Sequence, residues 1–164
     1  LPSTIYRDIM KRLQKREVMI VVDATKNLLV NVLEYHPFLI KPNNYELGEI
    51  FGVTLSTKED VILYAKKLQE MGAANVLVAM AGDGAVVVAE DGSSYKSEAP
   101  EGKVKNSVGA GDSMVAGFVA GYLNNGDYDE ALALGTACGG ATAFSYSLAK
   151  RDFIDECLAQ LKGE

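Results

Sequence analysis

Several classes of protein are excluded by what this sequence lacks. It has only two cysteines, Cys138 and Cys157, and each lies in an apolar helical pattern without a CxxC pair or a nearby histidine. We therefore expect two free, buried thiols in place of a disulfide or a zinc site. The one histidine, His36, stands before Pro37 in an expected loop, and we interpret it as incidental to catalysis.

Excess positive charge and long apolar runs are absent too. The net charge of −6 argues against nonspecific binding to nucleic acid or to an anionic membrane. No apolar run approaches the ~18 residues of a membrane-spanning helix, and no signal-peptide pattern is present. No G-x-G-x-x-G pattern follows the first expected strand, which argues against a Rossmann dehydrogenase. Together these features predict a cytoplasmic protein that has neither nucleic acid nor a membrane as a partner.

What is present is an alternation of strands and helices. The 48% hydrophobic content of the 164 residues is enough for one domain with an adequate core. We expect strands over 18–22, 38–40, 76–80, 85–89 and 94–97. We expect helices over 4–16, 24–34 and 45–51, from Ser56 to Gly72, from 109 to about 125, from Asp127, and at the end of the chain up to Gly163. This alternation is typical of an α/β layer fold with a largely parallel sheet, in which ligands gather at the carboxyl ends of strands.

Three local expectations accompany this reading of the chain. Ile5, Ile9 and Leu13 recur at four-residue steps and should form the inner face of the first helix. The strand over 18–22 is continuously apolar and should be buried on both faces. Ser56 and Glu59 should form a capping box at the start of their helix.

The stretch 105–122 carries the strongest chemical signal. Gly109, Ala110 and Gly111 open a helix rich in small residues, so their backbone N–H groups can approach a ligand closely. The amino terminus of a helix has N–H donors without intrahelical partners and favours an anion. Asp112 follows on the first turn and, beside a bound phosphate, could take the proton of an attacking hydroxyl. On these residues alone, a glycine-rich turn capped by Asp is an equally good interpretation.

Asn43 and Glu46 form a second candidate group. They stand three residues apart across a strand-to-helix turn, where their oxygens could together hold a water shell around Mg²⁺. Magnesium keeps most of its waters and needs only one or two protein oxygens besides phosphates. Without further context, an Asn cap and a Glu that complements the helix dipole is the favoured alternative.

Gly82, Asp83 and Gly84 follow a buried strand, where glycines would let a nucleotide lie against the backbone. A hairpin turn is the more common explanation of this pattern. Lys26 could reach a nucleotide phosphate, but a solvated loop lysine is the more common interpretation.

The small-residue helix over 135–144 also has two interpretations. Its lack of bulky side chains lets another helix pack very closely. Ala137, Gly139 and Gly140 could instead wall a slot for adenine. Both interpretations can hold together.

Several of these motifs resemble those of one family. Val-Gly-Ala-Gly-Asp-Ser at 108–113 is similar to the (D/S)-T-x-G-A-G-D signature of the ribokinase/PfkB carbohydrate kinases, and most of all to 1-phosphofructokinases. Lys-Pro-Asn-x-x-Glu at 41–46 is similar to the family's N-x-x-E element. The segment 81–85 matches the end of its S-x-G-x-x-G-A loop, although Ala-Met at 79–80 replaces the usual Ser-Leu. The segment 23–26 is similar to D-x-S-G, with Lys26 in place of the glycine.

The resemblance implies a ribokinase-like, Rossmann-like three-layer sandwich, of which this chain would be the carboxyl-terminal half. It implies that ATP and Mg²⁺ are cofactors, with Asn43 and Glu46 near the metal and the phosphates and the 81–85 loop bordering ATP. Asp112 would be the catalytic base, and the amides of 109–112 would hold the charge of the transferred phosphoryl group.

The expected reaction is ATP-dependent phosphorylation of a sugar phosphate, foremost of fructose 1-phosphate to fructose 1,6-bisphosphate. A tagatose-6-phosphate kinase, another PfkB sugar kinase, or a nucleotide-binding fragment without turnover are the alternatives. The family's sugar-binding residues and its lid belong to the amino-terminal half, so we expect this chain to be inactive by itself. The full-length protein could form a homodimer.

Overall fold

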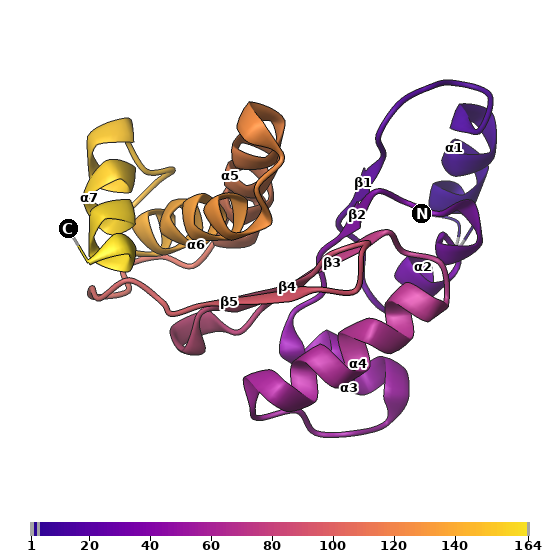
Figure 1. The fold of residues 1–164 in the computed structure, drawn as a ribbon, viewed down its shortest axis with the longest axis horizontal. Helices are drawn as coiled ribbons and strands as arrows, with labels where there is room; N and C mark the ends of the chain where they lie inside the picture. Colours follow the sequence, from indigo (N-terminus) through magenta and orange to yellow (C-terminus); the bar gives the residue numbers. More distant parts are fainter. Residues whose placement is uncertain (1, 3, 164) are drawn as a thin grey trace. The chain divides into compact units, whose positions relative to one another are not determined.

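The computed structural model describes residue 2 and residues 4–163 (Figure 1). Its contacts group the chain into two compact units. The first unit runs to Ala79 and takes in Val87–Ser94, whereas the second contains Met80–Val86 and the chain from Tyr95 onward. The expectation of a single domain stays a prediction.

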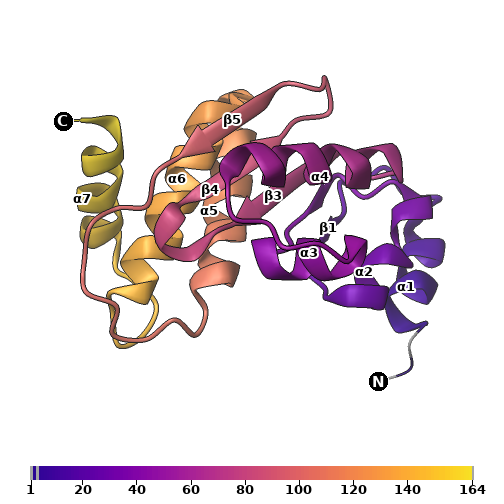
Figure 2. The same ribbon diagram turned by 90° about the horizontal axis from the view of Figure 1, so that it is seen from below.

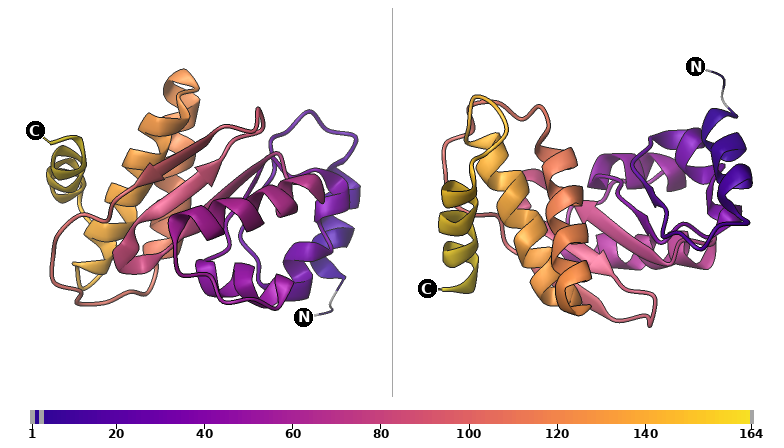
Figure 3. Two further views of the ribbon diagram at one scale, coloured as in Figure 1. Left: turned by 60° about the horizontal axis from the view of Figure 1, so that its bottom comes forward. Right: turned by 90° about the horizontal axis from the view of Figure 1, so that it is seen from above.

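The first unit alternates helices with short parallel strands. Along the chain these are α1 (Ile5–Leu13), β1 (Val21–Val22), α2 (Lys26–Val30), the 3-10 helix η1 (Leu33–Tyr35), β2 (Leu39–Ile40), α3 (Asn44–Phe51), α4 (Lys58–Glu70) and β3 (Asn75–Ala79). β2 pairs in parallel with β1 and with β3, so that Leu39 lies opposite both Val21 and Asn75. α4 packs along β3 (Figures 2 and 3).

The core of the first unit includes strand residues and the inner face of α4, together with side chains such as Leu29 of α2 and Leu47 of α3. The strands are apolar on both faces, as the strands of a covered parallel sheet require. The fully buried side chains include Leu39, Ile40, Val76, Leu77 and Val78 of the strands, and Val61, Ala65 and Leu68 of α4. The three positions in α4 are spaced by four and three residues, as the inner face of a helix requires.

The second unit contains the 3-10 turn η2 (Ala81–Asp83) and the helices α5 (Ala110–Asn125), α6 (Tyr128–Ala143) and α7 (Arg151–Lys162). β4 (Ala85–Val88) and β5 (Ser94–Ser97) form a hairpin at the two predicted strands, and each strand is divided between the two units. The strand order of the sheet is β1-β2-β3-β4-β5. A mostly parallel sheet accompanied by helices confirms the predicted α/β class.

α5 and α6 lie side by side because small residues line their contact (Figure 3). A Cβ atom added to Gly121 would lie 2.7 Å from Ala131 Cα, and one added to Gly135 would lie 2.9 Å from the carbonyl oxygen of Met114. Real Cβ atoms do not approach backbone so closely, so no larger residue fits at either position. The helix-packing interpretation of the segment 135–144 is confirmed.

The predicted strand over 18–22 is shorter and less buried than expected. Only Val21–Val22 forms β1, and the side chains of Val18 and Met19 are 53% and 55% exposed. The register explains this, because continuing the ladder by two residues would place Met19 opposite Pro37. Proline has no N–H group to donate, so the ladder stops.

Two further local expectations were wrong. Ile9 is 46% exposed, and Met10 is the buried residue of α1, so the inner face of that helix is turned by one residue from the predicted stripe. The cap of α4 is Thr57, whose Oγ1 accepts from the Asp60 N–H at 3.1 Å, in place of Ser56 with Glu59. Thr57 also donates to Asp60 Oδ2 at 2.7 Å, so this pair is the better capping partner.

The helix expected over 24–34 is broken into α2 and η1. Other predicted boundaries hold. Asp127 caps α6 by accepting from the N–H groups of Asp129 and Glu130, and α7 ends at Gly163.

Both cysteines are free, as predicted, but only Cys157 is fully buried, whereas Cys138 is half-buried. Burial raises the pKa of both thiols. No helix in the part of the chain that the structure describes is long and apolar enough to cross a membrane.

Candidate active site

α5 begins at the predicted glycine turn. Gly109 is its N-cap residue and has a φ of +82°, a conformation that glycine adopts without steric cost. Ala110, Gly111 and Asp112 form the first helical turn, and Asp112 is exposed. The four predicted residues therefore lie together on one helix start.

The backbone of this turn presents free donors. The first bond within the helix runs from the Ser113 N–H to the Gly109 carbonyl at 2.9 Å. Helix geometry therefore gives the N–H groups of Gly111 and Asp112 no acceptor within α5. Two such donors at the positive end of a helix of 16 residues suit a phosphate oxygen, and an exposed carboxylate stands beside them.

Asn43 and Glu46 form a complete capping box at the start of α3. The Asn43 Oδ1 accepts from the Glu46 N–H at 2.8 Å, and the Glu46 Oε2 accepts from the Asn43 N–H at 2.9 Å. The alternative that the sequence favoured without context is thus present. The box leaves the Glu46 Oε1 outside these two bonds, and both residues are half-buried. A magnesium role for this pair stays a prediction.

The carboxyl ends of the parallel strands meet beside this box. Asn43 forms an isolated parallel bridge with Ala79, the last residue of β3, and the Ala79 N–H donates to the Pro42 carbonyl at 3.2 Å. Asp23 follows β1 directly, and Lys41 follows β2. Polar residues therefore gather at this edge of the sheet in the first unit.

Lys41 also lies at this edge, although we assigned it no chemical role from the sequence. Its side chain is only 10% exposed, and its Nζ lies 3.4 Å from Asp23 Oδ2. A buried ammonium is costly unless it is paired, and Asp23 is the partner. The signal in the sequence was a charged residue placed directly after an apolar strand, at each of two neighbouring strands.

The segment 82–84 separates into two parts with different surroundings. Gly82 and Asp83 are exposed, and a Cβ atom on Gly82 would meet nothing within 4 Å. Gly84 is buried with a φ of +83°, and its added Cβ would lie 2.0 Å from the Ser97 carbonyl oxygen. Gly84 is therefore required by the fold, whereas Gly82 and Asp83 remain open to a ligand.

Lys26 begins α2 with a φ of +52° and forms an exposed ion pair with Glu49, with 3.4 Å between Nζ and Oε2. Exposed pairs of this kind contribute little to stability. Contact of Lys26 with a nucleotide phosphate stays a prediction.

The three residues proposed to wall an adenine slot are engaged in packing. Ala137 is fully buried in a cluster with residues of α7. Gly139 is buried, with its added Cβ 3.2 Å from the Ala110 carbonyl oxygen, and the added Cβ of Gly140 would lie 2.3 Å from Pro100 Cγ. Gly139 thus packs on the first turn of α5. Contact of these residues with adenine stays a prediction.

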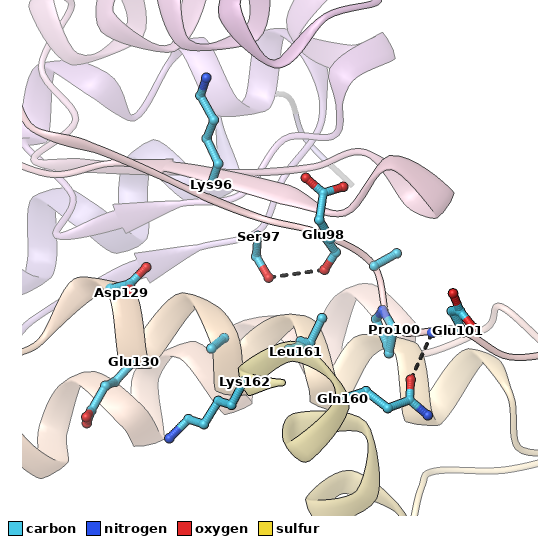
Figure 4. A pocket seen from close by; sticks show the side chains of 12 residues that line it. Lys96, Ser97, Glu98, Pro100, Glu101, Asp129, Glu130, Gln160, Leu161 and Lys162 are labelled. Atoms are coloured by element: carbon cyan, nitrogen blue, oxygen red, sulfur yellow. Dashed lines mark hydrogen bonds between the residues drawn. The ribbon is translucent and has the colours of Figure 1, made fainter. Parts of the chain in front are cut away.

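The second unit also contains a cavity of about 820 Å³ (Figure 4). It lies between the segment that follows β5, the start of α6 and the end of α7. Its lining includes Lys96, Glu98, Asp129, Gln160 and Lys162, and none of the residues that the sequence singled out. Gln160 is held there by accepting from the Glu101 N–H at 3.0 Å. Within the described residues, no group of three or more His, Cys, Asp and Glu side chains is placed to hold a metal ion.

Known proteins match the chain almost throughout. The pfkB family carbohydrate kinase model matches residues 1–152. The 1-phosphofructokinase of Bacillus subtilis is 42% identical over 162 residues, which are 99% of this chain and 53% of that protein. The D-tagatose-1-phosphate kinase of Bacillus licheniformis is 32% identical over 163 residues, again 99% of this chain and 53% of that protein.

The structure of phosphofructokinase-2 from Escherichia coli with substrates and products matches with a TM-score of 0.90 at 26% identity, over 99% of this chain and 53% of that one. The chain belongs to the pfkB family of carbohydrate kinases, and its fold is ribokinase-like, as the resemblance implied. It spans about half the length of the curated relatives it matches.

The two glycines of the segment 82–84 allow a matched test of the different surroundings assigned to Gly82 and Gly84. Gly84→Ala should destabilise the protein by about 2–5 kcal/mol, because it combines an unfavourable φ with a clash against backbone. Gly82→Ala should change stability by less than about 0.5 kcal/mol, because its Cβ meets open space. Urea unfolding monitored by circular dichroism measures both. Equal unfolding midpoints for the two variants would contradict the assigned contacts of Gly84.

Proposed function

We propose that this chain is the nucleotide-binding and catalytic-base part of an ATP-dependent sugar-phosphate kinase, with fructose 1-phosphate as the substrate. The observation that carries the proposal is the start of α5, where Gly111 and Asp112 present free N–H donors next to the exposed Asp112 carboxylate. Family membership supports a sugar kinase, and the glycine turn is the part of the chain best suited to a moving phosphoryl group.

Asp112 is the proposed base. It would accept the proton of the attacking sugar hydroxyl, while the N–H groups of the first turn would hold the negative charge of the transferred phosphoryl group. The donors are fixed by the helix backbone and need no side-chain rearrangement. An exposed carboxylate at this position can reach a hydroxyl that approaches the same turn.

Magnesium fits the Asn43–Glu46 pair as an outer-shell partner. When bound with ATP, the ion would neutralise charge on the phosphates. The capping box orients both side chains, and the second carboxylate oxygen of Glu46 remains for a metal-bound water. Lys41, buried beside Asp23 two residues before Asn43, would supply a positive charge to the phosphates.

The choice of sugar phosphate follows from similarity. The relative named 1-phosphofructokinase is 42% identical, and the relative named D-tagatose-1-phosphate kinase is 32% identical. This difference favours fructose 1-phosphate and leaves a tagatose phosphate as the second candidate. Neither the glycine turn nor its neighbours distinguish the two sugars chemically.

Asp112→Asn, in the enzyme that contains this chain, should lower turnover by about two to four orders of magnitude, because a general base contributes about that much. ATP affinity should change little, because the helix N–H donors remain. Steady-state kinetics and ATP titration measure the two effects. Asp152→Asn is the matched control, since Asp152 also lies on the first turn of a helix, α7. Turnover of the Asp112 variant above about a third of wild type would refute the assignment.

Glu46→Gln should raise the Mg²⁺ concentration needed for half-maximal rate, because it removes a charge near the metal. The amide oxygen can still accept from the Asn43 N–H, so the cap of α3 and the stability should persist. The control is Glu59→Gln on the first turn of α4. If the Mg²⁺ dependence of the Glu46 variant overlays that of wild type, the pair serves only as a helix cap.

The 164-residue chain alone should bind MgATP weakly and show no sugar-dependent ATP turnover. Positioning of the reactants accounts for about 7–11 kcal/mol of catalysis in the best-oriented reactions, and the family resemblance implies that the sugar-binding residues belong to the amino-terminal half of such a kinase. An ADP-release assay with fructose 1-phosphate, tagatose 6-phosphate and fructose 6-phosphate tests this, with the Bacillus subtilis enzyme as the positive control. Sugar-dependent turnover near ~1 s⁻¹, the low end of ordinary enzymes, would place a sugar site within this chain.

A further inference from the structure

The carboxyl-terminal turn of α6 carries a buried hydroxyl that links three segments around the start of α5. Thr142 is 2% exposed, and its Oγ1 donates to Ser113 Oγ at 2.9 Å. The same oxygen accepts from the Ala149 N–H at 3.3 Å. Ser113 directly follows Asp112, and its N–H closes the first turn of α5 on Gly109.

A second contact from the same turn holds the segment that leads into α5. The Ala143 carbonyl accepts from the N–H groups of Lys105 and Asn106 at 2.8 and 3.1 Å. Asn106 in turn accepts from the Val108 N–H at 3.1 Å and donates to the Tyr146 carbonyl at 3.3 Å. The last turn of α6 is therefore bonded to the residues before the glycine turn, to the residue after Asp112 and to the segment that follows α6.

The Thr142–Ser113 bond adds a directional link to the packing of the two helices. At the start of α5, Gly139 of α6 packs against the Ala110 carbonyl and Met114. A directional hydrogen bond resists sliding along the helix axis, and a buried one is not replaced by water when it is broken. The side-chain bond at the opposite end of the pair, from Asn125 to Glu130, is exposed.

We propose that Thr142 is a positioning residue, which holds Asp112 and the N–H donors of the first turn of α5 in their working place through Ser113. This inference rests on the proposed function of Asp112. The positioning of Asp112 depends on the Thr142 hydroxyl and not on the Thr142 methyl group, because only the hydroxyl forms hydrogen bonds with Ser113 and Ala149.

The chain offers a matched control on the same helix. Thr136 is also 2% exposed, but its hydroxyl donates only to the Leu132 carbonyl of α6 itself, at 2.8 Å. Thr136→Val therefore removes a buried hydroxyl without removing a link between segments. Thr142→Ser keeps the linking hydroxyl and loses only the methyl group.

In the enzyme that contains this chain, Thr142→Val should lower kcat about tenfold or more, since a displacement of about 1 Å can cost up to about a hundredfold. The KM for ATP should change by less than about twofold, because the N–H donors of the first turn of α5 and the charged side chains of the proposed site all remain. Thr142→Ser and Thr136→Val should keep kcat within about threefold of wild type. Retention of kcat in Thr142→Val, or an equal loss in Thr142→Ser or Thr136→Val, would overturn the proposal.

Hydrogen exchange measured by mass spectrometry gives a second readout that does not need activity. Amides of 107–115 and 145–150 should exchange at least about threefold faster in Thr142→Val than in Thr136→Val, because the broken link loosens both segments. If Thr142→Val does not fold, Ser113→Ala removes the acceptor of the same bond and should give the same result. Unchanged exchange rates of these amides would overturn the proposed link between Thr142 and the two segments. A wild-type enzyme without sugar-phosphate kinase activity would overturn the proposed function instead, and the exchange result would still decide the link.

Discussion

The close approach of α5 to α6 is the constraint on which the second unit depends. Backbone of one helix lies against backbone of the other at Gly121 and Gly135, where an added Cβ would lie within 3 Å of main-chain atoms. At these two positions the helix pair is therefore fixed by main-chain contacts, which cannot change by a rotamer switch. In the proposed function this rigidity is an advantage, because the N–H donors of the glycine turn would need no reorganisation when the phosphoryl charge arrives.

Local signals allowed much of the site to be predicted from the sequence. The Gly-Ala-Gly-Asp turn and the Asp127 cap specify helix starts through residues a few positions apart, and both lie where the sequence placed them. The hairpin of β4 and β5 follows from its Asp-Gly turn. Features that depend on residues far apart in the sequence could not be predicted from such local signals. The start of β1 is set by Pro37, which precedes the neighbouring strand β2, and the burial of Lys41 depends on Asp23, which is 18 positions away in the sequence.

The capping box of Asn43 and Glu46 does not compete with a role at a metal. A box fixes two side chains that would otherwise sample several rotamers, and so lowers the entropy lost when they order water around an ion. The bridge between Asn43 and Ala79 adds a main-chain anchor at the ends of β2 and β3. The same residues can thus serve the helix and the ligand, which is why sequence context alone left the two interpretations open.

The pairing of Lys41 with Asp23 sets the electrostatics of this strand edge. A lysine as buried as Lys41 would be costly without a counter-charge, and with one it forms a nearly neutral pair that the fold tolerates. The Lys41 ammonium group has three N–H donors and lies 3.4 Å from Asp23. It can therefore bind a second anion while it stays paired with Asp23. An arginine would need more room for its planar fork, and a neutral residue would leave Asp23 unpaired. The pair therefore keeps the edge stable in the absence of phosphate, and in the proposed function its ammonium group would also meet the phosphates.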